Sequence, residues 1–124
     1  MDVHVYIGVT DLQHGIEFYT RGLGLHLRRR LGANWVELTG ASVPIFLLVS
    51  NRPPNFAGPW TVHLDFITDD LEDAVRQAQD VGAVLQRDLQ ERQWGRMANM
   101  ADPFGNSFDL IEFVPGGYAR IDNA

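Results

Sequence analysis

The sequence predicts an α+β fold in which two similar βαβββ modules form curved mixed sheets around a concave pocket. Two observations carry this prediction. Val3-His4 followed by Asp11-Leu12 recurs 59 residues later as Val62-His63 followed by Asp70-Leu71. In each half, an alternating apolar segment is followed by a helical pattern and then by three more strand-like segments. A chain of 124 residues has the length of one domain. We therefore expect a single domain made of two modules that share a core.

The first module, at about residues 1–50, begins with a strand and a helix. Apolar side chains alternate with other residues over 3–9, which is the spacing of a strand with one apolar face. Thr10 is expected to cap the following helix, with Gln13 in the capping-box position. Gly22 ends that helix. Three strands separated by glycine-containing turns complete the module, at 25–31, 35–39 and 44–49.

The second module, at about residues 60–115, follows a proline-rich linker at 51–59. A strand over 61–67 precedes a helix that is expected to start after Asp69 and to stop at Gly82. The remaining segments are expected to be strands at 85–89, 97–101 and 107–114, with a tight turn at 102–106.

Composition excludes several classes of function. The formal net charge is −6 and the pI is near 5, which argues against nucleic acid as a partner. The sequence has no cysteine, so it has no disulfide, thiolate ligand or cysteine nucleophile, and this fits a reducing, cytoplasmic location. We expect no signal peptide, and no segment approaches the ~20 apolar residues that span a bilayer. The basic run Arg28–Arg30 is expected to be a solvated part of a strand.

The strand alternation indicates which polar side chains share the face opposite the helices. On the first strand the apolar residues pack on the helix, so His4 and Tyr6 point to the other face. The same reasoning places His63 and Asp65 of the fifth strand on that face, together with Asp109 of the last strand. His4, His63 and Asp109 form a ligand set for Fe, Mn, Zn or Ni that leaves positions open for a substrate. Asp65 either orients an imidazole or is a solvated edge residue.

Further residues are expected to line the pocket. Phe46 takes the inward position on the fourth strand, and Trp35 is expected to form part of the pocket wall. Glu37 shares that side and is a candidate proton-transfer group if it is desolvated. Arg96 is a candidate contact for an anion, or else an exposed loop arginine, and Trp94 is expected beside the pocket.

Three groups of residues form a pattern that covers the chain from Val3 to about Phe113. They are Val9-Thr10-Asp11-Leu12 with Phe18-Tyr19 and Gly22-Leu23-Gly24; His63–Ile67 with Asp69-Asp70-Leu71 and Gly82-Ala83; and Asp102-Pro103-Phe104-Gly105-Asn106 with Phe108-Asp109-Leu110-Ile111-Glu112. With this pattern the sequence resembles the vicinal oxygen chelate superfamily, which includes glyoxalase I, the bleomycin-resistance proteins and the extradiol dioxygenases. The resemblance implies paired βαβββ modules around a metal or ligand pocket. It also implies a homodimer, since a second subunit usually completes the pocket.

The resemblance also assigns ligand positions within this sequence. The family's metal ligands fall on His4, His63 and Asp109, and a fourth position falls on Phe46. Phenylalanine cannot coordinate a metal, and Asp109 is shorter than the glutamate that the family typically has there. Glyoxalase I uses four protein ligands, so its activity is not expected. A three-ligand site is similar to those of the extradiol dioxygenases and the fosfomycin-modifying transferases.

Two classes of function follow from the residues and the resemblance. The first is a metal enzyme that chelates two neighbouring oxygens of a small substrate and performs lyase, isomerase or oxygenase chemistry. The second is a metal-free protein that sequesters a cationic drug or other small ligand, as the bleomycin-resistance proteins do. The acidic charge and the tryptophans Trp35, Trp60 and Trp94 suit the second class. We favour the first, because a sequestering groove has no use for two histidines and an aspartate on converging strands.

Overall fold

The computed structural model of the protein describes residues 2–51 and 63–121, so Trp60 and Val62 lie outside the described residues. The first half forms a strand, a helix that continues into a π-helical segment, and three strands: β1 (Val5–Val9), α1 (Leu12–Glu17) with Phe18–Gly22, β2 (His26–Arg30), β3 (Trp35–Thr39) and β4 (Ile45–Val49). The second half forms β5 (Leu64–Ile67), α2 (Leu71–Asp80), β6 (Val84–Leu85), β7 (Gln90–Arg92), β8 (Gly95–Ala101) and β9 (Ser107–Phe113), followed by a short 3₁₀ helix at Gly117–Arg120.

The two halves build two mixed sheets with the same topology. The strand order is β1-β4-β3-β2 in the first sheet and β5-β9-β8-β6 in the second, where β7 also pairs with β8. In each sheet the strand before the helix runs parallel to the last strand, and the other pairs are antiparallel. The α+β fold of repeated βαβββ modules is therefore confirmed. The second module differs from the prediction in one respect: the predicted strand at 85–89 is replaced by the short β6 and the additional β7.

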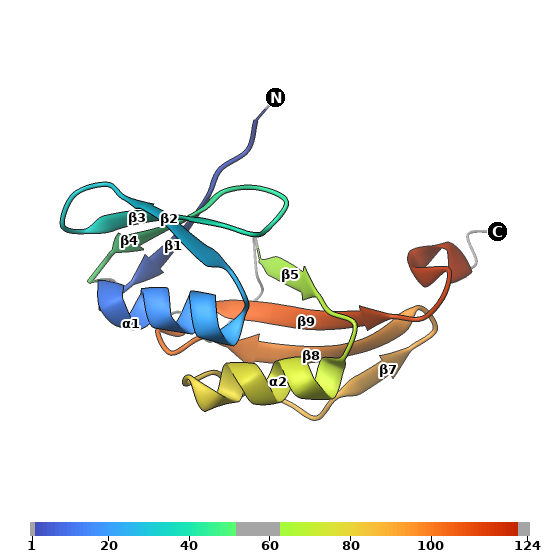
Figure 1. Cartoon of the computed structure of the whole chain (residues 1–124). Coiled ribbons are helices and arrows are strands. Elements are labelled where there is room, and N and C mark those ends of the chain that lie inside the picture. The colour runs from blue at the N-terminus through green and yellow to red at the C-terminus, as the bar shows by residue number, and fades with distance from the viewer. Residues whose placement is uncertain (1, 52–62, 122–124) are drawn as a thin grey trace.

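The helices pack on one face of their sheets, and the two modules share a core (Figure 1). Ile7 and Val9 of β1 are buried in this core, as their alternation predicts. Phe18, which follows α1, packs edge-on against Phe108 of β9, with ring centroids 6.1 Å apart. Phe108 in turn contacts Phe66 of β5 at 5.8 Å. Aromatic contacts therefore join the two modules through their helix-facing sides.

The repeated Asp-Leu pair marks the start of both helices. Asp11 caps α1 by accepting from the His14 backbone N–H at 2.9 Å, and Asp70 caps α2 by accepting from the Asp73 N–H at 3.1 Å. The prediction that Thr10 and Asp69 cap these helices was wrong by one residue each time. Aspartate accepts this hydrogen bond as well as threonine does, so composition alone does not choose between neighbouring polar residues.

The predicted turn at 102–106 connects the second module to the first. Buried Asp102 accepts hydrogen bonds from the Phe104 and Asn106 backbone N–H groups at 2.9 and 2.8 Å. It also accepts one from the Tyr19 hydroxyl of the first module at 2.5 Å. The Asn106 side chain donates to Gly8 O of β1 at 2.8 Å. Among the described residues, no helix is long and apolar enough to cross a membrane.

Candidate functional site

The second sheet brings one histidine and two aspartates together on the face opposite α2. Parallel pairing places Asp65 of β5 next to Asp109 of β9, and His63 lies two residues before Asp65 on the same face. His63 Nε2 lies 3.0 Å from Asp65 Oδ1 and 3.6 Å from Asp109 Oδ2. One ligand atom from each of the three residues lies within 4.8 Å of the other two. We call these three residues the His-Asp-Asp cluster.

The burial of Asp109 makes it unfavourable for both carboxylates of the cluster to be ionised without a compensating positive charge. Asp109 is only 4% exposed, whereas Asp65 is solvent-accessible. Burial raises the pKa of the Asp109 carboxyl above its ordinary value, and the neighbouring charge of Asp65 raises it further. A hydrogen bond from Asn99 and the proximity of His63 act in the opposite direction on this pKa. A cation held between the two carboxylates would offset their repulsion.

The chemistry and spacing of the cluster fit a divalent metal ion. Imidazole nitrogen and carboxylate oxygen are ligands of first-row metals such as Fe, Mn and Zn. Atoms that bind one ion at ~2.1 Å lie roughly 3 Å apart when they occupy neighbouring positions. His63 Nε2 lies 3.0 and 3.6 Å from the two carboxylate oxygens, which is close to that value. The His-Asp-Asp cluster is thus a possible metal site.

The first sheet presents an aromatic surface on the face opposite α1. Tyr6 of β1 stacks on Phe46 of β4 with ring centroids 4.9 Å apart, and Trp35 of β3 lies 6.2 Å from Phe46. His4 precedes β1 and packs on Phe46 at 5.0 Å. These four side chains therefore lie together on one face of the first sheet, as the strand alternation predicts. We call Tyr6, Trp35 and Phe46 the aromatic wall.

His4 is not part of the His-Asp-Asp cluster, although a cavity links the two modules nearby. This cavity has a volume of about 240 Å³ and lies between β1 and β5. Both Tyr6 and His63 line it, together with Phe66 and Phe108. The aromatic wall and the cluster thus each contribute a residue to one cavity.

Glu37 lies beside the aromatic wall but is held by two arginines. Its residue is 8% exposed, and its Oε1 lies 3.1 Å from Arg29 Nε on β2. Arg28 Nη1 lies 3.6 Å from the other carboxylate oxygen. The sequence makes Glu37 a candidate proton-transfer group if it is desolvated. The structure shows a buried carboxylate that is paired with two arginines, and the proton-transfer role stays a prediction. Strand β2 is exposed throughout, as expected for the basic run, but the pairing with Glu37 was not predicted.

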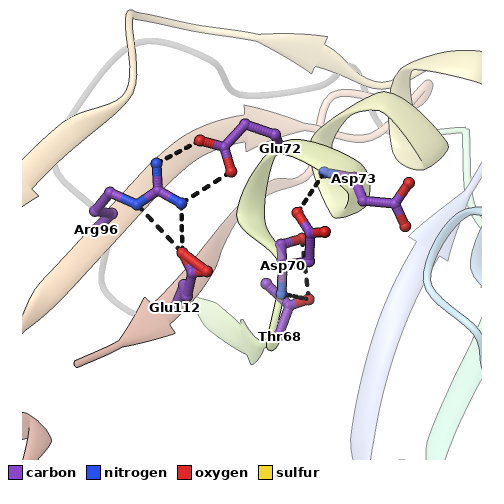
Figure 2. A network of polar contacts seen from close by, with 6 residues as sticks. All are labelled: Thr68, Asp70, Glu72, Asp73, Arg96 and Glu112. Carbon is purple, nitrogen blue, oxygen red and sulfur yellow. Dashed lines mark hydrogen bonds and ion pairs between the residues drawn. The ribbon is translucent and has the colours of Figure 1, made fainter. Parts of the chain in front are cut away.

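Arg96 lies on the opposite side of the second sheet from the cluster. Neighbouring Ala98 is buried in the core on the α2 side, and Arg96 has the same strand parity. Its guanidinium bridges Glu72 of α2 and Glu112 of β9, as Figure 2 shows. Within the described residues, the side-chain hydrogen bonds of Arg96 all go to these two carboxylates, so the guanidinium connects α2 to the sheet. The expected anion contact of Arg96 therefore has no support in this arrangement.

Trp94 also lies apart from the aromatic wall. Its ring packs against Phe113 at 6.0 Å and against Tyr118 of the C-terminal 3₁₀ helix at 5.2 Å. These contacts hold the C-terminal 3₁₀ helix against the end of the second sheet, and the pocket role of Trp94 stays a prediction.

One residue that the sequence reasoning missed is Asn99 of β8. It is buried, and its Nδ2 donates to Asp109 Oδ1 at 2.8 Å. The signal was present, because Asn99 is the one polar residue of the otherwise apolar segment 97–101 within β8.

Comparisons with known proteins agree with this architecture. Residues 4–111 match the family model of the glyoxalase-like domain. Comparison with curated protein sequences gives no significant match.

Solved structures share the fold at low sequence identity. A glyoxalase/bleomycin resistance protein/dioxygenase family enzyme from Burkholderia phytofirmans PsJN superposes with a TM-score of 0.75 at 19% identity, covering 92% of this chain and 100% of that one. The fosfomycin resistance protein FosX from Listeria monocytogenes gives 0.73 at 15% identity, with 90% and 92% coverage. TioX from Micromonospora sp. ML1 gives 0.70 at 18% identity, with 92% and 99% coverage. At these identities the shared property is the fold.

Proposed function

Since this chain belongs to the glyoxalase-like domain family, we propose that it is a metal-dependent enzyme acting on a small substrate with two neighbouring oxygen atoms. The observation that carries the proposal is the convergence of His63, Asp65 and Asp109 on one face of the second sheet. These residues would hold the divalent ion. When bound, the ion would supply a Lewis acid that stabilises negative charge on the substrate oxygens. The reaction would then be of lyase, isomerase or oxygenase type.

The proposed ligand set extends the one derived from the sequence. His63 and Asp109 are common to both, and Asp65 joins them because its Oδ1 lies 3.0 Å from His63 Nε2, closer than Asp109 Oδ2 at 3.6 Å. His4 stays a proposed ligand of the same site. In its support, His4 is two residues before Tyr6, and Tyr6 lines the same cavity as His63.

The aromatic wall is proposed to bind the apolar part of the substrate. Tyr6 is 52% exposed, so its ring is accessible on the face that Phe46 and Trp35 share with it. Apolar rings there would exclude water and strengthen polar interactions with the substrate. Phe46 is not a metal ligand, which supports a reaction other than that of glyoxalase I.

A metal-free binding protein is the second candidate, and the same aromatic wall favours it. Stacked rings at Tyr6 and Phe46 offer a surface for a planar or cationic ligand. In that case the contacts within the His-Asp-Asp cluster would be structural and the cluster would hold no divalent ion. The two candidates therefore differ in whether the cluster binds a divalent ion.

We also propose that the protein is a cytoplasmic homodimer. Within the described residues, β1 pairs only with β4 and β5 pairs only with β9, which leaves one edge of each sheet available for another chain. Exposed Tyr6 and Ile67 lie near these edges. Sedimentation that shows a monomer at micromolar concentration would contradict the dimer.

The test of the metal proposal is a calorimetric titration with Mn²⁺ or Zn²⁺ at neutral pH. We expect about one ion per chain for the wild type and at least a tenfold loss of affinity for His63→Ala, because a ligand is removed. His26→Ala is the matched control, since His26 is an exposed histidine of β2, and we expect it to bind as the wild type does. Absence of binding by the wild type would favour the metal-free candidate.

A further inference from the structure

A row of side-chain hydrogen bonds crosses the second sheet and ends at Asp109. Arg92 of β7 donates from Nη2 to Gln90 Oε1 at 2.5 Å, and Gln90 Nε2 donates to Asn99 Oδ1 of β8 at 2.5 Å. Asn99 Nδ2 then donates to Asp109 Oδ1 of β9 at 2.8 Å. The other carboxylate oxygen, Asp109 Oδ2, is the one that faces His63. The row therefore runs from an exposed arginine to a buried carboxylate of the His-Asp-Asp cluster.

The residues at both ends of the row require its hydrogen bonds to run in the same direction, from donors at Arg92 to an acceptor at Asp109. Arginine has only donors, so Gln90 must present its carbonyl oxygen to Arg92 and its NH₂ group to Asn99. An ionised aspartate has only acceptors, so Asn99 must present its NH₂ group to Asp109 and its oxygen to Gln90. The two requirements are compatible, and each amide has one orientation that satisfies both neighbours. Arg92 is itself fixed by a second bond, from Nη1 to the Glu91 carbonyl at 3.0 Å.

We propose that Asn99, Gln90 and Arg92 are positioning residues for the metal site, and that they act by holding Asp109 so that only Oδ2 is available to a cation. This inference rests on the proposed metal-binding function. Asn99 occupies Asp109 Oδ1 directly. Gln90 fixes the orientation of the Asn99 amide, and Arg92 fixes that of Gln90. Ligating carboxylates are commonly oriented by such hydrogen bonds.

The proposal makes a distinctive prediction for Arg92, because the positive charge of Arg92 weakens Mn²⁺ binding, whereas its hydrogen bond to Gln90 strengthens it. If Arg92 acted only through its charge, removing it would reduce repulsion of a cation and Mn²⁺ would bind as tightly or more tightly. If Arg92 acts through the row, its loss lets Gln90 and Asn99 reorient, and Mn²⁺ binding weakens. The sign of the change in affinity thus separates the two roles.

The experiment is a calorimetric titration of the full chain with Mn²⁺. Asn99→Leu removes the donor to Asp109 and is expected to weaken binding by about 10- to 100-fold, as losses of such partners do. Arg92→Gln is expected to weaken it several-fold, and Arg87→Gln is the control that removes an equal charge from another exposed position. In a Gln90→Leu background, Arg92→Gln is expected to cause no further weakening, because the row is already broken. Thermal melting confirms that each variant is folded.

Three results would overturn the inference while leaving the proposed function intact. They are wild-type affinity in Asn99→Leu, unchanged or tighter binding in Arg92→Gln, and an effect of Arg92→Gln that persists in full without Gln90. Since Arg92 is exposed, its variant is informative even if a substitution at buried Asn99 prevents folding. A wild type that binds no Mn²⁺ would overturn both the inference and the metal-dependent function.

Discussion

The hydrogen bond between Tyr19 and Asp102 is expected to make a measurable contribution to stability, which Tyr19→Phe isolates. Both residues are 2% exposed, and the hydroxyl donates to Asp102 Oδ2 at 2.5 Å. The substitution keeps the ring in the core and removes one oxygen. It deprives a buried carboxylate of one of its four donors, the others coming from Phe104 and Asn106.

The magnitude follows from the charge and burial of the acceptor. Hydrogen bonds to charged groups contribute about 1.5–3 kcal/mol. Asp102 keeps three donors in the variant, so we expect the lower half of this range, about 1.5–2 kcal/mol of lost unfolding free energy. Asp102→Asn removes the charged acceptor, and Tyr19→Phe should cost clearly less in that background, because the two residues act through one bond.

The bond also predicts a dependence on alkaline pH. Burial raises the pKa of Tyr19 well above its ordinary value of 10.0, and the charge of Asp102 and its hydrogen bond raise it further. The protonated native hydroxyl therefore contributes its full stability below pH 10, and this contribution is lost as the pH rises toward the folded-state pKa. Tyr19→Phe cannot ionise there, so the stability difference between wild type and variant should narrow above pH 10.

Urea unfolding followed by circular dichroism measures these differences. Tyr118→Phe serves as the control, since Tyr118 is 52% exposed, and it should change stability by less than about 0.5 kcal/mol. A Tyr19→Phe variant as stable as this control would refute the reasoning.

Three further predictions concern other parts of the fold. The pKa of Glu72 is lowered to about 2, chiefly by its hydrogen bonds with Arg96, so the stability from this contact is present above pH 4.5 and is lost as the pH falls toward 2. Glu72→Gln should therefore reduce the loss of unfolding free energy on acidification, and a pH dependence equal to that of the wild type would contradict the contact. Asp109→Asn should make the metal-free protein more stable at neutral pH, because it removes a carboxylate whose pKa is raised by burial and by Asp65. A calorimetric titration of this variant should show the loss of metal binding. A variant less stable than the wild type would argue against an unfavourable burial of the Asp109 carboxylate. Gly95→Ala should destabilise the protein by more than about 2 kcal/mol in urea unfolding, because a Cβ there would lie 2.2 Å from the Glu112 backbone oxygen. An unchanged unfolding free energy would show that β8 and β9 can move apart at this point at little cost.

The fold was predictable from the sequence because its signals are local and repeated. Alternation placed β1, β3 and β9 at or near their observed positions, and the Asp-Leu repeat marks two helix starts. Strand β7 was missed, because its Gln90–Arg92 segment has no apolar alternation and is held as a strand by pairing with β8. Local patterns carry no information about such a partner-dependent strand.

The candidate site was predictable in part. Alternation placed His63 and Asp109 on one face, but the neighbour relation of Asp65 and Asp109 depends on the parallel register of β5 and β9. That register is a property of the assembled sheet. Arg96 shows an available signal that was not used: its parity with buried Ala98 already places it on the helix side.

An anomalous-scattering measurement on crystals grown with Mn²⁺ tests the proposed metal site most directly. The account predicts one strong peak per chain within coordination distance of His63, Asp65 and Asp109, with Asp109 contributing only Oδ2. The same map would show whether His4 is also a metal ligand. A protein saturated with Mn²⁺ that shows its peak away from His63 and Asp109, or shows none, would contradict the account.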